Sequence, residues 1–402
     1  MEVYHFPEDL EQAIDEVAGG ESDSAEVAHA VGELSDLFLG LGRWRGDYAG
    51  SPALRRAYLH YYLPVNLPKV RVPLGEWLRD DPRRLAGAPL HCLDLGAGLG
   101  TAIIGLLDFL RWLPPAQRPT AVRAVALDQS FESLRDAARL VERIARLIPG
   151  LPVSFEPLRV DLMADRSEIF PLAVAQGRFD LVIASNVLCE IARESPDGSE
   201  RAARLMETAG RDLLSPRGAL VIVEPGLRET SRDLHRLRDR WLASGLLHVQ
   251  APCLHEAPCP ALATDRDWCI AELPWHPPRR VTSLDRRTGL RKSSLKFSYL
   301  LLTAASPAPR CPATWRVVSD VLDLKGERRV YLCAEGRWIV LAQLKRAAGP
   351  LADAFVRMRR GDLIEIEGLE RKGGIYRLTP GAALRRIEPP PSAASPDAVE
   401  PG

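Results

Sequence analysis

One short stretch constrains the fold of this chain more than any other. It reads His91-Cys-Leu-Asp-Leu-Gly-Ala-Gly-Leu-Gly-Thr101, an apolar run followed by glycines at alternate positions. The residues after Thr101 carry apolar side chains at helical spacing. Glycine lets the backbone turn sharply and approach a ligand, and a helix N-terminus offers unpaired N–H groups and a positive dipole end. The stretch therefore predicts a strand–turn–helix unit that holds a nucleotide or an adenosine cofactor.

Patterns along the chain divide it into four parts. Residues 1–82 carry apolar residues at helical spacing and predict a helical region. Residues 83–305 alternate strand and helix patterns, which predicts an α/β domain with a Rossmann-like, parallel sheet and an irregular Cys- and Arg-rich insertion at 249–295. Residues 312–388 hold short strands and predict a small β-barrel of OB type. The Pro-, Ala- and Ser-rich tail 389–402 is expected to be disordered. The strands of the α/β domain are predicted at 91–95, 121–127, 153–160, 179–185, 219–223 and 297–303.

Polar residues follow successive predicted strands. Asp128, Asp161 and Asn186 each stand at or just after the end of one, and Asp94 ends the strand before the glycines. In open α/β sheets, ligands bind outside the carboxyl ends of the strands, where a carboxylate accepts hydrogen bonds from ribose hydroxyls. We therefore expect these residues to converge on one crevice. The candidate cofactor-binding residues are Asp94, Gly96, Gly98, Gly100, Thr101, Asp128, Asp161 and Asn186.

The glycine spacing distinguishes between two cofactors. The NAD fingerprint is G-x-G-x-x-G, whereas this chain has Asp94-x-Gly96-x-Gly98-x-Gly100. The latter form resembles motif I of class I S-adenosylmethionine-dependent methyltransferases, and this resemblance implies ribose and adenine contacts for Asp128 and Asp161. No catalytic base is visible in the sequence. Methyl transfer can proceed mainly through positioning, so whether the chain is an enzyme stays open.

Three cysteines lie close together in the insertion. Cys253, Cys259 and Cys269 fall within 17 residues of Pro-broken chain, without a C-x2-C pair. Thiols on such loops favour zinc or an iron–sulfur cluster, and buried or incidental thiols are the alternative. A fourth ligand has to come from elsewhere, and the spacing alone leaves His255, Cys311 and Cys333 open.

A specific resemblance narrows these alternatives. The runs Val221-Ile-Val-Glu-Pro-Gly226, Ala251-Pro-Cys253, Ala257-Pro-Cys259, Asp267-Trp-Cys269 and Lys296-Phe-Ser-Tyr-Leu300 resemble the methyltransferase-like assembly proteins of the small ribosomal subunit, a family with a mitochondrial member. The resemblance covers roughly residues 50–340. It implies a structural [4Fe-4S] cluster held by Cys253, Cys259, Cys269 and Cys333, with zinc as the alternative metal.

A basic run follows the cysteines, between residues 278 and 296. It contrasts with the whole chain, in which 53 Lys and Arg balance 53 Asp and Glu. We interpret it as the best phosphate-binding candidate, and a solvated basic loop is the alternative reading. The candidate RNA-binding residues are Arg279, Arg280, Arg286, Arg287, Arg291, Lys292 and Lys296.

Three functions remain in competition at this point. The first is an assembly factor that binds S-adenosylmethionine and the 16S rRNA of the small ribosomal subunit, and that methylates this RNA. The second is a non-enzymatic RNA-binding assembly factor, and the third a small-molecule methyltransferase. No apolar run approaches the length of a membrane span, and the acidic first residues lack a signal-peptide core. We therefore expect a cytoplasmic protein without membrane contact, monomeric when free.

Overall fold

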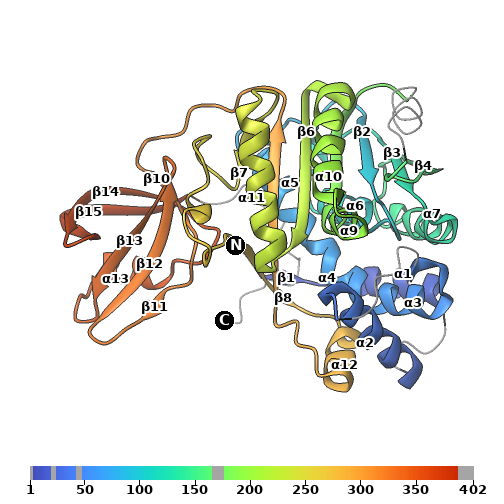
Figure 1. Cartoon of the computed structure of the whole chain (residues 1–402), viewed down its shortest axis with the longest axis horizontal. Coiled ribbons are helices and arrows are strands. Elements are labelled where there is room, and N and C mark those ends of the chain that lie inside the picture. The colour runs from blue at the N-terminus through green and yellow to red at the C-terminus, as the bar shows by residue number, and fades with distance from the viewer. Residues whose placement is uncertain (1–2, 20–23, 42–47, 165–175, 388–402) are drawn as a thin grey trace.

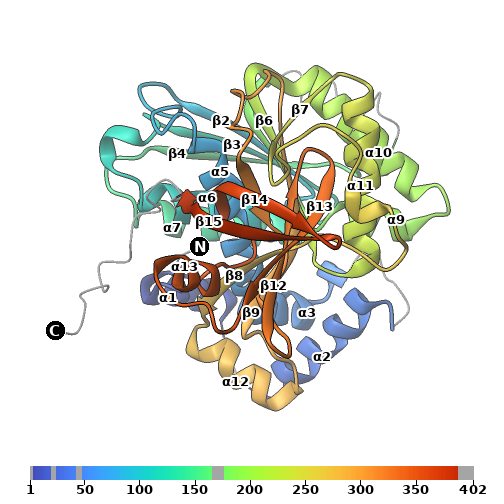
Figure 2. The same cartoon turned by 90° about the vertical axis from the view of Figure 1, so that its left-hand side faces the viewer.

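The fold of this chain combines an α/β body with a β-barrel at one end (Figure 1). The computed structural model describes residues 3–19, 24–41, 48–164 and 176–387. The tail 389–402, expected to be disordered, lies outside the described residues. Figure 2 shows the barrel facing the viewer, with the larger body behind it.

A nine-stranded sheet forms the centre of the α/β body. Its order is β1-β8-β9-β6-β5-β2-β3-β4, and β7 pairs with β9. Every strand predicted for this domain is present. The strands are β1 (Tyr4–His5), β2 (Leu90–Leu95), β3 (Val122–Asp128), β4 (Val153–Arg159), β5 (Phe179–Ser185), β6 (Leu214–Pro225), β7 (His248–Ala251), β8 (Ala271–His276) and β9 (Ser294–Thr303).

The prediction of a parallel sheet is correct for only part of it. Strands β2 to β6 pair in parallel. Strand β9 runs antiparallel to β6, and β7 and β8 run antiparallel to β9. The sheet is therefore mixed. Strand β9 is buried and apolar throughout most of its length, as are the parallel strands β2 and β5, so its sequence carries no mark of its direction.

Helices cover both faces of the sheet. The N-terminal helices, α6 and α7 share one hydrophobic core with one face, and α9, α10 and α11 pack on the other. The N-terminal region therefore folds onto the sheet rather than apart from it. The helices are α1 (Glu8–Ala18), α2 (Ala25–Leu39), α3 (Pro52–Ala57), α4 (Leu63–Asn66), α5 (Arg71–Leu78), α6 (Thr101–Arg111), α7 (Phe131–Ala145), α9 (Leu188–Glu194), α10 (Gly198–Thr208) and α11 (Arg228–Ala243).

The segment 249–295 is more regular than its sequence suggests. It contains β8 and the helix α12 (Arg279–Thr288), which begins after Pro278 and ends at Gly289 in the left-handed conformation. Val281 and Leu284 of α12 are buried. Two buried positions on one face are enough to dock a short polar helix, and a strongly charged sequence hides that signal.

The C-terminal strands close into a barrel. The strands are β10 (Thr314–Val317), β11 (Leu322–Asp323), β12 (Glu327–Ala334), β13 (Arg337–Leu344), β14 (Leu363–Lys372) and β15 (Ile375–Ile387). Five of them form a closed ring, since β10 pairs with both β12 and β14, and β13 pairs in parallel with β15. Helix α13 (Pro350–Val356) connects β13 to β14. Apolar residues from all five strands fill the interior, so the predicted small barrel is confirmed.

Candidate functional site

The glycine turn joins β2 to α6 and uses backbone conformations that other residues rarely adopt. The angle φ is +71° at Gly96 and +53° at Gly98. A side-chain carbon added to Gly98 would meet no atom within 4 Å, so the space beside it is open. At Gly96 such a carbon would lie 2.4 Å from Cγ2 of Val187, so this side chain closes the space there.

A cavity of about 110 Å³ lies at the carboxyl ends of β2 to β5. The structure brings seven of the eight predicted cofactor residues to its wall. The exception is Gly100, where an added carbon would lie 3.1 Å from Cβ of Ala137 in α7. Gly100 therefore allows close packing between the turn and α7, and its assignment to the cofactor wall is corrected. The lining residues predicted from the sequence are Asp94, Gly96, Gly98, Thr101, Asp128, Asp161 and Asn186.

Hydrogen bonds fix the polar side chains at the cavity wall. One oxygen of Asp128 accepts from the N–H of Gly98 at 2.8 Å, and the other accepts from the N–H of Ser130 at 2.8 Å. Asp161 accepts from the N–H of Met163 at 2.8 Å. Carboxylates held in this way keep their orientation before a ligand arrives.

The cavity is strongly acidic. Asp94 is 1 % exposed, and its Oδ2 has no hydrogen-bond partner within the described chain. Burial and the nearby Asp128 raise the pKa of Asp94 to about 8. Burial, Asp128 and Glu224 likewise raise the pKa of Glu190 to about 8. Carboxylates that repel one another in a buried site favour a cationic ligand, because its positive charge restores their ionised form.

Sequence reasoning missed several residues of this wall. Arg55 and Tyr58 come from the N-terminal region, and Glu190 and Glu194 come from α9. The hydroxyl of Tyr58 lies 3.5 Å from Oγ1 of Thr101. Nothing in the local pattern marks Arg55 or Tyr58, because only the docking of α3 onto the sheet brings them here.

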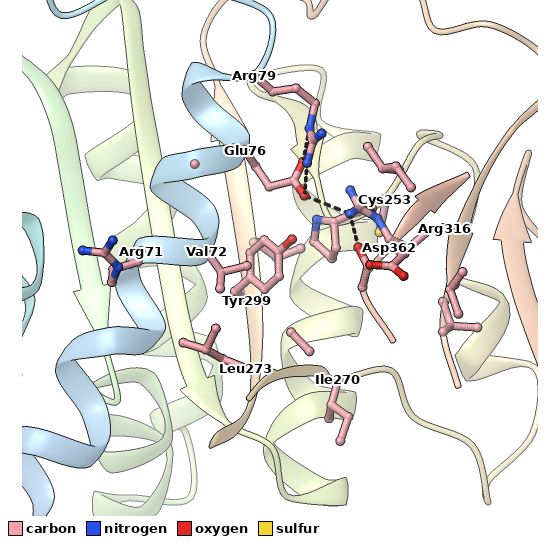
Figure 3. A pocket seen from close by; sticks show the side chains of 18 of the residues that line it. Arg71, Val72, Glu76, Arg79, Cys253, Ile270, Leu273, Tyr299, Arg316 and Asp362 are labelled. Carbon is pink, nitrogen blue, oxygen red and sulfur yellow. Dashed lines mark hydrogen bonds and ion pairs between the residues drawn. The ribbon is translucent and has the colours of Figure 1, made fainter. Parts of the chain in front are cut away.

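The four predicted cysteine ligands line a second cavity, of about 180 Å³. Helix α5, strand β9 and the barrel strand β10 are among the elements that form its other walls, and Cys253 lies beside Arg316 in Figure 3. The side chain of His255 also lines it, with Nε2 at 3.7 Å from Sγ of Cys333. Cys311 is exposed and lies outside this wall. The cysteines that line the cavity are Cys253, Cys259, Cys269 and Cys333.

The donors around this cavity do not form a site for a single ion. Among the residues that the structure describes, no three His, Cys, Asp or Glu side chains come together closely enough to hold one metal ion. Burial, and then the neighbouring Cys253, raise the pKa of Cys259 and of Cys269 to about 12. Without a metal these two thiols are protonated near neutral pH.

A buried ion pair closes the same cavity on another side. Glu76 of α5 accepts from Nη1 of Arg316 in β10 at 2.8 Å and from Nε of Arg79 at 3.1 Å (Figure 3). Arg316 also donates to the carbonyls of Pro252 and Gly361. This network joins the N-terminal region, the cysteine segment and the barrel.

The basic segment is mostly solvent-exposed, with two exceptions. Arg280 is 6 % exposed, donates to Nδ1 of His60 at 3.0 Å and forms an ion pair with Asp15. It holds α12 against the N-terminal helices, so it has no surface to offer a phosphate, and its assignment to RNA is corrected. Lys292 is partly buried, and burial lowers its pKa. The exposed members are Arg279, Arg286, Arg287, Arg291 and Lys296.

Comparison with protein families identifies the relationship. The model of the family described as mitochondrial small ribosomal subunit Rsm22 matches residues 55–360. The chain belongs to the Rsm22 family. The Rsm22 match extends from Arg55 in α3 to Arg360, and so includes the glycine turn, the basic segment and all four cysteines of the second cavity.

Other comparisons add little to the Rsm22 match. A protein of Listeria monocytogenes described as a putative class I S-adenosylmethionine-dependent methyltransferase is 14 % identical, with 76 % of this chain and 89 % of that one covered and a TM-score of 0.35. An S-adenosylmethionine-dependent methyltransferase of Agrobacterium tumefaciens is 16 % identical, with 58 % and 62 % covered and a TM-score of 0.31. The rRNA methyltransferase AviRa of Streptomyces viridochromogenes is 16 % identical, with 39 % and 73 % covered and a TM-score of 0.26. No curated protein matches the chain.

None of the helices within the described ranges has both the length and the apolar character that crossing a lipid bilayer requires.

Proposed function

We propose that this chain is an S-adenosylmethionine-binding assembly factor of the small ribosomal subunit, and that it methylates 16S rRNA. The acidic cavity beside the glycine turn carries the first part of the proposal, and the Rsm22 family carries the link to the ribosome. A non-enzymatic assembly factor with the same two cavities is the alternative. No catalytic residue is assigned. The expected cytoplasmic location stays a prediction, since the family description names a mitochondrial ribosome. The expected monomeric state also stays a prediction.

The residues of the acidic cavity fit the chemistry of this cofactor. S-adenosylmethionine carries a sulfonium and an ammonium group, and the unpartnered oxygen of buried Asp94 would accept from the latter. The open space beside Gly98 leaves room for a ligand against the backbone. Asp128 ends β3, where a carboxylate accepts from ribose hydroxyls. Bound there, the cofactor would supply an activated methyl group.

Two measurements separate the forms of this proposal. We expect the protein to co-sediment with small ribosomal subunits, and we expect labelled methyl groups from S-adenosylmethionine to enter the RNA of assembling subunits. Co-sedimentation without methyl transfer would support the non-enzymatic form. Methyl transfer to small molecules without co-sedimentation would overturn the ribosomal assignment.

Asp128→Asn is expected to weaken binding of S-adenosylmethionine about 10- to 100-fold, because it removes a charged acceptor from the ribose and from the turn. Isothermal titration calorimetry measures this change. Glu132→Gln is the matched control, since Glu132 is an exposed carboxylate at the start of α7 outside the cavity wall. Equal affinity of Asp128→Asn and the wild type would remove the ribose assignment.

We also propose that the exposed basic residues of 279–296 bind RNA phosphates. All five lie on α12, on the turn after it or at the start of β9, in a chain without net charge. The barrel is proposed to be OB-like, since its helix lies between the third and fourth strands of the closed ring and its third and fifth strands pair in parallel. Such barrels bind single strands on their outer face, which would give the RNA a second contact.

Charge reversal tests the basic segment. The triple change Arg286→Glu, Arg287→Glu and Arg291→Glu is expected to weaken binding to a 16S rRNA fragment at least about 10-fold. It is also expected to reduce the salt dependence of binding, since each lost phosphate contact lowers the slope of log K against log salt concentration by about 0.7. Filter binding at several salt concentrations measures both. The control changes Arg211→Glu and Arg217→Glu reverse two exposed arginines, one just before β6 and one within it. An effect of the same size per reversed charge in both sets would indicate that only net charge matters.

We further propose that the second cavity holds a [4Fe-4S] cluster. The family resemblance implies four cysteine ligands, and four cysteines line one cavity without converging on a single point. A cluster of several atoms separates its thiolates more widely than one zinc ion does, so this arrangement favours the cluster over zinc. Arg238, whose side chain is fully buried, lies within electrostatic range of Cys253 and Cys259. Its charge would partly offset that of four thiolates.

A further inference from the structure

The wall of the cofactor cavity carries many more acidic than basic side chains. Five carboxylates line it, whereas Arg55 is the only Lys or Arg among its described lining residues. A cavity that serves only to attract a cation has no need of an arginine. Arg55 therefore gives this acidic wall one place at which a negatively charged group of a ligand could bind. The five carboxylates belong to Asp94, Asp128, Asp161, Glu190 and Glu194.

The side chain of Arg55 is held firmly in place. The residue is 9 % exposed, and its Nε lies 3.1 Å from the carboxylate of Asp136 in α7. Its Nη1 donates to the carbonyls of Ala49 at 2.7 Å and Gly50 at 3.3 Å. Among the described residues, Nη2 takes part in none of the hydrogen bonds of Arg55, so with respect to these residues its two N–H groups are free to donate. A guanidinium oriented by two sets of acceptors offers these donors at little entropic cost.

The proposed cofactor carries one group that could pair with the guanidinium of Arg55. The sulfonium and the ammonium of S-adenosylmethionine are cationic, and its ribose and adenine are neutral near neutral pH. Its α-carboxylate is the single anionic group. Hydrogen bonds between a guanidinium and a carboxylate are about twice as strong as hydrogen bonds between two uncharged groups.

We propose that Arg55 binds the α-carboxylate of the cofactor's amino-acid end, an inference that rests on the proposed binding of S-adenosylmethionine. Tyr58, on the next turn of the same helical segment, already reaches Thr101 of α6. Arg55 thereby links the ligand to the N-terminal region, and a cofactor with its amino-acid end intact holds α3 against the glycine turn.

The test compares ligands that differ at the amino-acid end. S-adenosylhomocysteine has the intact end, its decarboxylated analogue keeps the ammonium alone, and 5′-methylthioadenosine lacks both groups. By calorimetry, the wild type is expected to bind S-adenosylhomocysteine about 10- to 100-fold more tightly than the decarboxylated analogue. This comparison uses the unaltered protein, so it is independent of how any variant folds.

Substitutions then assign the effect to Arg55. Arg55→Gln is expected to weaken S-adenosylhomocysteine binding by about the same 10- to 100-fold and to change methylthioadenosine binding by less than about 2-fold. Arg56→Gln, next in the chain and outside the cavity wall, is expected to change neither.

The outcomes distinguish a failure of the proposed role of Arg55 from a failure of the proposed cofactor binding. The role of Arg55 would be overturned, with cofactor binding left intact, if the wild type bound S-adenosylhomocysteine and its decarboxylated analogue equally well. The same would follow if Arg55→Gln lost equal affinity for S-adenosylhomocysteine and for methylthioadenosine. A wild type that binds none of the three adenosine ligands would overturn the proposed function, and this inference with it.

Discussion

Glu76→Gln is expected to lower the free energy of unfolding by about 3–5 kcal/mol, the cost of leaving a buried charge without its partner. The side chains of Glu76 and Arg316 are 6 % and 4 % exposed. Glutamine keeps the shape of the side chain but leaves the Arg316 guanidinium buried without a carboxylate. Because the pair joins α5 to β10, we expect the barrel to lose its fixed position as well. Urea unfolding followed by tryptophan fluorescence measures the change.

A surface ion pair provides the control for this experiment. Glu200 and Arg240 lie in contact at the surface, where each side chain is more than 40 % exposed. Glu200→Gln is expected to cost less than about 1 kcal/mol. If both variants lost the same small amount, the Glu76–Arg316 pair would have no special part in holding the barrel.

The same pair makes stability depend on pH. Burial opposes ionisation of Glu76, but Arg316 and Arg79 outweigh it and lower the pKa of this carboxyl from 4.5 to about 2. Between these values the unfolded chain binds more protons than the folded one. The stabilisation is therefore complete above about pH 5 and is lost as the pH falls towards about 2. Over that range the wild type is expected to lose stability faster than Glu76→Gln, and parallel curves would contradict the assignment.

Cys333→Ser is expected to remove the proposed cluster, with iron falling from about four atoms per chain to near zero and the absorbance at about 400 nm disappearing. Cys333 lies in the barrel strand β12, whereas the other three cysteines precede β9. Losing this ligand would also release the barrel from the α/β body. Iron and sulfide analysis and the spectrum of anaerobically purified protein measure the first effect, and limited proteolysis at the linker 304–313 measures the second.

Cys311→Ser is the matched control, because Cys311 is exposed and outside the cavity wall. It is expected to keep both iron and colour. A colourless, iron-free wild type would refute the cluster. Retention of iron in Cys333→Ser would mean that another residue, such as His255, is the fourth ligand.

Much of this fold could be predicted from local patterns. Strands β2 to β6 and β9 of the α/β body appear where apolar runs predict them, whereas β1, β7 and β8 were not predicted. Seven of eight residues predicted for the cofactor line one cavity. Such signals are local, because a buried strand needs consecutive apolar residues and a tight turn needs glycine. The misses concern relations between distant segments. Gly100 packs against α7, Arg280 pairs with Asp15, and β9 runs antiparallel to β6.

The chain by itself determined the glycine turn, the order of strands and helices, and the types of side chain available for a cofactor and a metal. The tertiary structure alone decided which charges meet: that Arg55 of the N-terminal region enters an acidic cavity, and that Glu76 reaches Arg316 across 240 residues. The reason is physical. Backbone conformation follows from neighbouring residues, whereas the pairing of buried charges depends on which surfaces exclude water together once the whole chain has packed.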